Sequence, residues 1–564
     1  MREAWLAMLS DLNICSQKGL VERFDGTIGA GTVLMPYGGR YQKTPADGMV
    51  AKIPVRRGET DTASFMAHGY DPELAVWSPF HGAACAVLLS CARIAALGAD
   101  WRKTYLTLQE YFEKLTDKKS WGKPASALLG AYLMQRRLGL GAIGGKDSMS
   151  GTFNDLHVPP TLVSFAVAPG RASEAVSQDW KKEGNALVLF DVPYDEAGMP
   201  DTDVFAAHAD FLYKEVQAGH IASMKAVGRG GIAVTAAKMA FGSGIGAAFN
   251  DALAPAEYFR LRYGAILAET SPELAADYAK RGHVTVLGTL GGADMTLGGE
   301  NVSVAELLAA SEKTLDPVFP LRAQDLPGTV EALPAYTGAP TVRTSLAVAK
   351  PRVFIPVMPG TNCEVDSARA FERAGAETDI FIVRNRDQSE LKASVEDMAA
   401  RIRQAQIVMF PGGFSAGDEP DGSGKFIAAL FRNPLLESAL GDLLNNRDGL
   451  ALGICNGFQA LIKLGLVPYG EFKPLTADAP TLTFNTIGRH LSRYVTTRVV
   501  SAKSPWLSLC KEGELHSIAI SHGEGRFIAS DEQIREWAAN GQIATQYTDP
   551  EGRPSYDSRF NPNG

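Results

Sequence analysis

Short apolar runs alternate with amphipathic stretches through the last third of the chain. The runs have strand length, and they lie at 353–357, 378–383, 406–410 and 450–454. Helical spacing follows them, at 367–376, 389–405 and 455–465. This alternation predicts a parallel α/β sheet, in which functional residues gather at the carboxyl ends of the strands. Glycine-bearing loops at 411–417 and 455–457 follow two of the predicted strands.

The earlier part of the chain shows a different mixture of patterns. The stretch 81–98 is apolar on most faces, which predicts a buried helix. Strand-like runs at 161–168 and 186–192 lie on either side of an expected boundary near residue 172. Prolines recur through 316–350 and predict an extended linker. The expected organisation is therefore a first domain, a second domain, a linker and a third domain, at 1–172, 173–315, 316–350 and 351–564.

Composition narrows the class of protein. The 564 residues carry 55 basic and 63 acidic side chains, so the net charge is −8. The sequence has no long run of Lys and Arg, which argues against a dedicated nucleic-acid-binding protein. Six cysteines without a Cys-x-x-Cys pair exclude a disulfide scaffold and a zinc site built on paired cysteines, and they suit the cytoplasm. The longest apolar stretch, 83–99, contains Ser90 and Arg93 and falls short of the roughly 20 residues of a membrane span.

Cys455 is the strongest candidate for catalysis. It lies between a predicted strand and a predicted helix, with Gly453 and Gly457 two residues away on either side, as in a nucleophile elbow. The amino end of a helix favours the thiolate form of a cysteine. The backbone N–H of Asn456 and one from the loop Gly412-Gly413-Phe414 are candidate donors to an oxyanion. The alternative is that Cys455 is a small buried hydrophobic residue.

The other cysteines lack such flanking residues, and we interpret them as structural. They are Cys15, Cys85, Cys91, Cys363 and Cys510.

Several motifs support a resemblance to known families. GICNGFQ and FPGGFSAGD resemble the class I glutamine amidotransferases. The segments PVMPGTNCEVDSARAFERAGA, GDEPDGSGKF, NTIGRHLSRYV, SHGEGRF and NPNG are similar to the glutaminase domain of large single-chain phosphoribosylformylglycinamidine synthases. Earlier motifs, SDLNICSQKGLVERFD, WSPFHGA, LTLQEYFEKL and GGKDSMSGTF, resemble the second synthetase repeat of the same family.

The resemblance implies an α/β and α+β multidomain chain. A two-domain repeat similar to aminoimidazole ribonucleotide synthetase would precede a class I glutaminase domain with a parallel sheet. The implied activity is that of an ATP-dependent ligase of purine biosynthesis, which makes formylglycinamidine ribonucleotide from formylglycinamide ribonucleotide, glutamine and ATP. Cys455 would attack glutamine, and Gln459 would help to hold it unless Gln459 is a solvated helix residue. ATP or ADP and Mg²⁺ are the implied cofactors.

In the family, the second repeat carries an auxiliary nucleotide site. The matching residues here are Gly144, Gly145, Lys146, Asp147 and Ser148. Asp147 would bind Mg²⁺, with Asp47 as a second expected metal ligand; ordinary turns are the alternative at both places. Leu89 and Arg93 stand where another branch of the family has a Glu and an Asn, and the loop Gly228–Gly231 lacks an Asp found in related synthetases. Both departures weaken the expectation of a tight magnesium–nucleotide site.

The histidine partner of Cys455 is not evident in the sequence. His522 and Glu524 have a suggestive spacing, but in the family this SHGEGRF segment precedes NPNG, and the catalytic pair follows it. We therefore expect the catalytic His and Glu beyond Gly564, and a missing amino-terminal half of the enzyme as a partner. Two alternatives stay open: a non-catalytic nucleotide-binding scaffold that needs a partner chain, or another glutamine amidotransferase fused to a synthetase-like domain.

Overall fold

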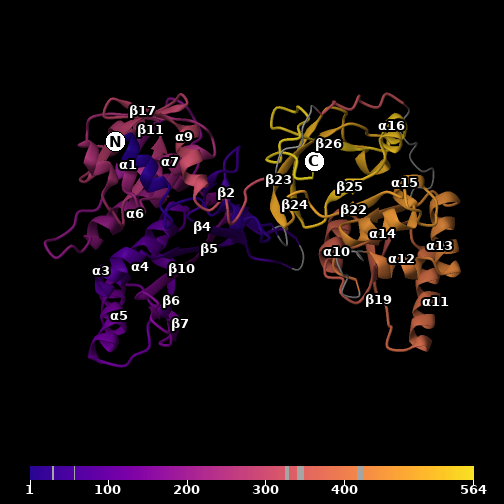
Figure 1. Ribbon diagram of the computed structural model, residues 1–564, viewed down its shortest axis with the longest axis horizontal. Helices are drawn as coiled ribbons and strands as arrows, with labels where there is room; N and C mark the ends of the chain where they lie inside the picture. Colours follow the sequence, from indigo (N-terminus) through magenta and orange to yellow (C-terminus); the bar gives the residue numbers. More distant parts are fainter. Residues whose placement is uncertain (28–30, 56–57, 324–329, 339–347, 416–423, 564) are drawn as a thin grey trace. The chain divides into compact units, whose positions relative to one another are not determined.

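The computed structural model describes residues 1–27, 31–55, 58–323, 330–338, 348–415 and 424–563. The chain divides into two compact units, Met1–Leu321 and Arg322–Gly564 (Figure 1). Parts of the predicted linker and of the loop at 411–417 lie outside the described residues.

Unit 1 contains two main sheets. The six-stranded sheet has the spatial order β1(Thr32–Leu34), β4(Gly48–Lys52), β5(Thr62–Gly69), β10(Thr161–Arg171), β6(Tyr105–Tyr111), β7(Ala142–Ser148). The seven-stranded sheet has the order β12(Ser223–Ala226), β14(Ile266–Thr270), β11(Ala186–Phe190), β15(Val284–Leu290), β13(Ala247–Phe249), β16(Asp294–Leu297), β17(Glu300–Ser303). Two short hairpins complete the strands, β2(Tyr37–Gly38) with β3(Thr44–Pro45) and β8(Thr152–Phe153) with β9(Leu156–His157). Both main sheets are largely antiparallel, as an α+β class requires.

The helices of unit 1 cover these sheets. They are α1(Arg2–Leu9), α2(Lys18–Val21), α3(Pro72–Trp77), α4(Pro79–Ala96), α5(Lys118–Leu138), α6(Thr202–Gln217), α7(Gly231–Phe241), α8(Pro272–Tyr278) and α9(Val304–Lys313). Helix α4 begins after Ser78, whose hydroxyl caps the N–H of His81, and packs against β5, β10 and α5. Most of its residues are buried, which confirms the predicted buried helix.

Strand β11 is buried on both faces and divides the core of unit 1. Val188 and Phe190 face the core shared with the six-stranded sheet, and Leu187 and Leu189 face a core that contains Trp5. The indole nitrogen of Trp5 donates to the carbonyl oxygen of Ala233 over 3.0 Å. Helix α1 therefore packs with the seven-stranded sheet, although the sequence placed it in a first domain at 1–172. The division near residue 172 stays a prediction.

By length and apolar composition alone, α4 is the one helix in the described part of the chain that could cross a membrane. Within the protein, 78% of that apolar window is buried.

Unit 2 is built on a parallel sheet, as the alternating pattern predicts. Its order is β19(Glu377–Ile382), β18(Arg352–Val357), β20(Ile407–Phe410), β21(Leu450–Gly453), and all neighbouring strands are parallel. The helices of this unit are α10(Glu364–Arg373), α11(Gln388–Gln404), α12(Lys425–Phe431), α13(Pro434–Asn445), α14(Asn456–Leu464), α15(Leu466–Tyr469) and α16(Asp531–Ala539). The carboxyl ends of β20 and β21 thus lie side by side, which places the two glycine-bearing loops together.

An antiparallel layer follows the parallel sheet in sequence. It consists of a three-stranded sheet, β24(Leu515–His522), β23(Leu491–Val499), β26(Thr545–Thr548), and a two-stranded pair, β22(Thr481–Thr483) with β25(Arg526–Ile528). Residues 330–338 of the expected linker contact this layer, since the amide of Tyr336 donates to the carbonyl of Val500 over 2.9 Å.

Candidate active site

Cys455 forms the turn between β21 and α14 and is exposed to solvent. Its backbone angles are φ 54° and ψ −113°, a strained conformation for a residue with a Cβ atom. A Cβ at Gly453 would lie 2.6 Å from the carbonyl oxygen of Gly457, and one at Gly457 would lie 2.1 Å from that of Phe410. The turn therefore requires both glycines, and the exposed thiol rules out the alternative of a buried hydrophobic cysteine.

The loop after β20 lies against this turn. A Cβ at Gly412 would lie 3.3 Å from the Cβ of Cys455. The amide of Phe414 donates to the carbonyl of Gly360 over 2.8 Å, so it is not available to bind an oxyanion. The amide of Gly413 donates to no acceptor among the described residues, and this residue has φ +139°. Gly413 is thus the loop's best candidate for an oxyanion donor, together with Asn456 at the start of α14; both roles stay predictions.

Cys363 lies beside the same loop. Its sulfur would be 3.4 Å from a Cβ at Gly412, and it donates to the side-chain oxygen of Asn362 over 3.0 Å. The expectation that Cys363 is a structural cysteine without catalytic neighbours therefore misses its place beside the Cys455 loop. Cys363 comes shortly after β18, and β18 is the parallel neighbour of β20. The loops that follow these two strands therefore lie at the same edge of the sheet, which is the sequence feature that could have predicted Cys363 beside the Gly412 loop.

Gln459 lies on the first turns of α14 and is only 8% exposed, so it is not a solvated helix residue. Its side-chain nitrogen donates to the Glu524 Oε2 over 2.8 Å. The prediction that it binds glutamine stays a prediction, and the contact shows that the SHGEGRF segment reaches the helix of Cys455.

His522 is held within that segment. Its Nδ1 lies 2.9 Å from the side-chain oxygen of Asn485, and its backbone oxygen accepts from the same side chain over 2.7 Å. Burial, followed by the charge of His490, lowers the pKa of His522. A Cβ at Gly525 would lie 2.2 Å from the imidazole ring, so the ring packs over this glycine. These contacts explain His522 as a structural residue; its exclusion from catalysis stays a prediction.

The expected nucleotide residues 144–148 lie in strand β7, not in a loop. Strand β7 pairs with β6 in parallel, and a Cβ at Gly145 would lie 2.5 Å from the carbonyl oxygen of Leu108. The alternative of an ordinary turn is therefore wrong here, because strand pairing accounts for Gly145; the nucleotide-binding role of these residues stays a prediction. Gly144 has open space where a Cβ would be. The Lys146 ammonium lies 5.9 Å from the ring centroid of Tyr111.

Asp147 has a second carboxylate as its neighbour. It pairs with Glu110 across β6 and β7. Burial, and then the charge of Asp147, raises the pKa of Glu110. Two adjacent carboxylates fit the ligand preference of Mg²⁺. No sequence signal marks Glu110 within LTLQEYFEKL as a site residue; its strand register with Asp147 makes it a candidate second ligand. Ser148 lies at the end of β7, where its hydroxyl is 3.3 Å from that of Ser150.

Asp47 does not fit a metal. It is 4% exposed, its Oδ1 lies 2.5 Å from the ammonium of Lys225, and its Oδ2 accepts from the amide of Ala226 over 2.7 Å. The Lys225 ammonium takes the place that a cation would need, so the prediction of Asp47 as a metal ligand is corrected to a buried ion pair. Nearby, Arg93 donates to the carbonyl of His68 over 2.8 Å, and Leu89 is buried.

Comparison with known proteins identifies relatives of unit 2. Residues 350–564 match the CobB/CobQ-like glutamine amidotransferase domain family. Over 220 residues the chain is 36% identical to phosphoribosylformylglycinamidine synthase subunit PurQ of Methanococcus maripaludis, a match that covers 38% of this chain and 73% of that relative. The same subunit of Dehalococcoides mccartyi is 34% identical over 217 residues, with 38% and 77% covered.

Solved structures give weaker likenesses. T. maritima PurL complexed with FGAR aligns with a TM-score of 0.44 and 13% identity, over 81% of this chain and 78% of that one. The structure of PurLQS from Thermotoga maritima aligns with a TM-score of 0.42 and 14% identity, over 60% of this chain. This chain spans about half, 55%, of the length of that second structure.

Proposed function

The chain belongs to the phosphoribosylformylglycinamidine synthase family, and from that premise we propose that unit 2 releases ammonia from glutamine at Cys455. The observation that carries the proposal is the exposed thiol of Cys455 on a strained turn, directly beside the Gly412-Gly413 loop. An exposed nucleophile between a helix amino end and a loop with a free amide is the arrangement that acyl transfer needs.

The proposed reaction proceeds in two steps. The Cys455 thiolate attacks the carboxamide carbon of glutamine, and the amides of Gly413 and Asn456 stabilise the negative oxygen that forms. The carbon–nitrogen bond breaks, the nitrogen takes up a proton and leaves as ammonia, and a glutamyl thioester remains. Water then attacks the thioester, which releases glutamate and restores the thiol.

We propose that the ammonia serves an ATP-dependent ligation. In that reaction ATP activates the formyl amide oxygen of formylglycinamide ribonucleotide, and ammonia displaces the phosphate to give the amidine, with ADP and phosphate as further products. Magnesium would supply charge neutralisation at the phosphates, and Asp147 with Glu110 would hold it in unit 1. Such chemistry would place the protein in the cytoplasm, where these metabolites occur.

A second candidate function concerns unit 1 alone. The ion pair of Asp47 with Lys225 occupies one expected metal position, which favours a structural scaffold over a nucleotide site. Calorimetry with Mg–ADP separates the two: binding that Asp147→Ala removes supports the nucleotide site, and the absence of binding supports the scaffold.

The test of the glutaminase proposal is ammonia release from glutamine by the protein together with the histidine and glutamate that would complete the catalytic triad of Cys455. We expect Cys455→Ser to abolish the release. Cys15→Ser is the matched control, because Cys15 lies in unit 1 and its thiol donates only to the carbonyl of Leu12, a bond that a serine hydroxyl can keep; we expect this variant to retain the wild-type rate. Unchanged release by Cys455→Ser would overturn the proposal.

A further inference from the structure

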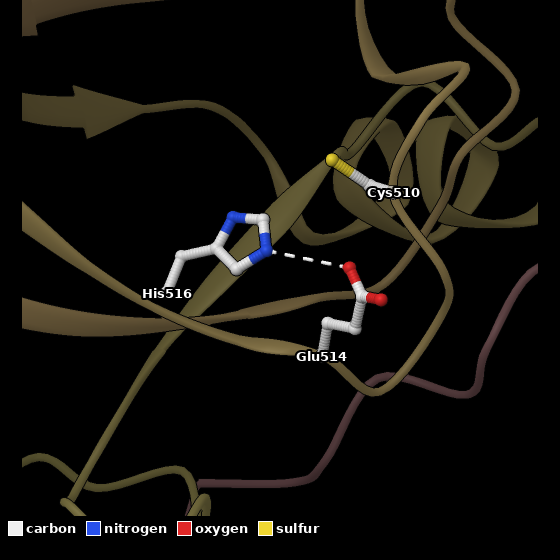
Figure 2. Close-up of side chains that lie close together, drawn as sticks. All are labelled: Cys510, Glu514 and His516. Atoms are coloured by element: carbon white, nitrogen blue, oxygen red, sulfur yellow. Dashed lines mark hydrogen bonds and ion pairs between the residues drawn. The ribbon is translucent and has the colours of Figure 1, made fainter.

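Three side chains of different chemistry converge between β23 and β24. Figure 2 shows that Cys510 and Glu514 lie on the side of the His516 ring that carries Nε2. One potential ligand atom from each residue lies within 4.8 Å of the other two. Cys510 and His516 are half-buried, and Glu514 is exposed. None of the three belongs to the loops around Cys455.

The spacing suits a small transition-metal ion. In a tetrahedral site with zinc–ligand bonds of about 2.0–2.3 Å, neighbouring ligand atoms lie roughly 3.3–3.6 Å apart. The His516 Nε2 already lies 3.4 Å from the Glu514 Oε2. The cysteine sulfur needs to approach by roughly 1 Å at most, a rotamer adjustment for a side chain that is not fully buried.

Backbone hydrogen bonds hold the segment that carries Cys510 and Glu514. The amide of Cys510 donates to the carbonyl of Leu507 over 2.9 Å. Gly513, with φ +87°, makes the tight turn and donates to the carbonyl of Val499 over 2.8 Å. The amide of Val499 donates in return to the carbonyl of Glu514 over 2.9 Å. The ligand-bearing segment is therefore anchored to strand β23.

A buried oxygen acceptor lies on the same face of the sheet as His516. Thr497 stands opposite His516 in the β23–β24 ladder, which puts both side chains on one face of the sheet. The Thr497 hydroxyl is buried and has no hydrogen-bond partner among the described residues. Metal-bound histidines commonly donate their second ring N–H to such an oxygen.

We propose that Cys510, Glu514 and His516 bind one divalent transition-metal ion of the zinc class, with water as the remaining ligand. Thiolate and imidazole ligands select such an ion over Mg²⁺ or Ca²⁺, which prefer oxygen. The absence of a Cys-x-x-Cys pair excludes only zinc sites built on paired cysteines, whereas the proposed site contains a single cysteine, Cys510. The metal joins both ends of the segment 510–516, which leads into β24 and on to Glu524. The site is independent of the glutaminase proposal.

Titration of the full chain with Co²⁺, followed by absorbance, tests the site. We expect one equivalent to produce a thiolate-to-cobalt charge-transfer band that Zn²⁺ displaces. Cys510→Ser should abolish the band, and His516→Gln, which removes a ligand itself, should weaken binding by more than the roughly 10–100-fold that loss of a ligand-orienting residue costs. The control is His220→Gln, because His220 also pairs with a carboxylate, Glu215, at 2.7 Å but is not part of the proposed site. It should leave the titration unchanged.

Two results would overturn the proposal. One is a wild-type chain that binds neither Co²⁺ nor Zn²⁺ at concentrations equal to its own. The other is a band that survives in Cys510→Ser and disappears in Cys455→Ser or Cys363→Ser, which would place the ion at the other thiols. Circular dichroism of each variant verifies that it is folded, and the two ligand variants lie on different parts of the segment, so failure of one to fold leaves the other informative.

Discussion

The side-chain amide of Gln459 donates a 2.8 Å hydrogen bond to Glu524, a residue 65 positions further along the chain. Gln459 belongs to helix α14, which begins immediately after Cys455, and Glu524 follows strand β24. The antiparallel layer thus braces the helix whose amino end presents the thiol. The bond is sheltered, because Gln459 is nearly buried.

We predict that Glu524→Ala destabilises unit 2 by about 1–2 kcal/mol, since it removes a charged acceptor and leaves the Gln459 amide unpaired. Urea denaturation followed by fluorescence measures the change. Glu536→Ala, at an exposed position of α16, is the control and should stay within about 0.5 kcal/mol of wild type. Equal stabilities of the two variants would contradict the bracing role.

The strain at Cys455 gives a second prediction. Glycine adopts φ 54°, ψ −113° without steric cost, whereas alanine keeps the penalty of a Cβ atom. We expect Cys455→Gly to be more stable than Cys455→Ala by about 1 kcal/mol, while neither releases ammonia. Thermal unfolding of both variants checks this. If Cys455→Ala is as stable as Cys455→Gly, the turn is not strained.

Much of unit 2 was predictable, because its apolar runs are separated by loops with clear glycine signals. The runs at 353–357 and 450–454 became β18 and β21, and the elbow at Cys455 followed from two glycines. The neighbourhood of Cys363 was missed, since it depends on which strands are adjacent in space. The alternative of an ordinary turn at residues 144–148 is wrong, because Gly145 allows close strand pairing that depends on the distant strand β6. The partner of Asp47 is 178 residues away in sequence, so local pattern could not reveal it.

That ion pair gives a third prediction. Lys225 and Asp47 are 6% and 4% exposed, so Lys225→Met leaves a buried carboxylate without its counter-charge. We expect a loss of about 3–5 kcal/mol in the stability of unit 1. The double variant Asp47→Asn with Lys225→Met should recover much of it, because no charge is left unpaired. A double variant no more stable than Lys225→Met alone would show that charge pairing is not the cause.

Lys238 predicts a dependence of stability on pH. Burial, and then the charges of Lys225 and Arg93, lowers the pKa of Lys238 to about 7 from its ordinary 10.5. Between these values the unfolded chain holds the proton and the folded chain does not, so this residue makes stability rise with pH. Lys238→Met removes the contribution. Its stability advantage over wild type should be largest below pH 7 and shrink towards pH 10 in urea titrations; a constant difference would contradict the shift.

The central claim is that Cys455 is the nucleophile for glutamine. The most direct measurement is treatment of the folded chain with a glutamine-analogue electrophile, followed by mass-spectrometric mapping of the modified peptide. The account predicts one label, on Cys455, with glutamine protecting against it and with the nearby Cys363 unmodified. Label on another cysteine while Cys455 stays free in folded protein would contradict it.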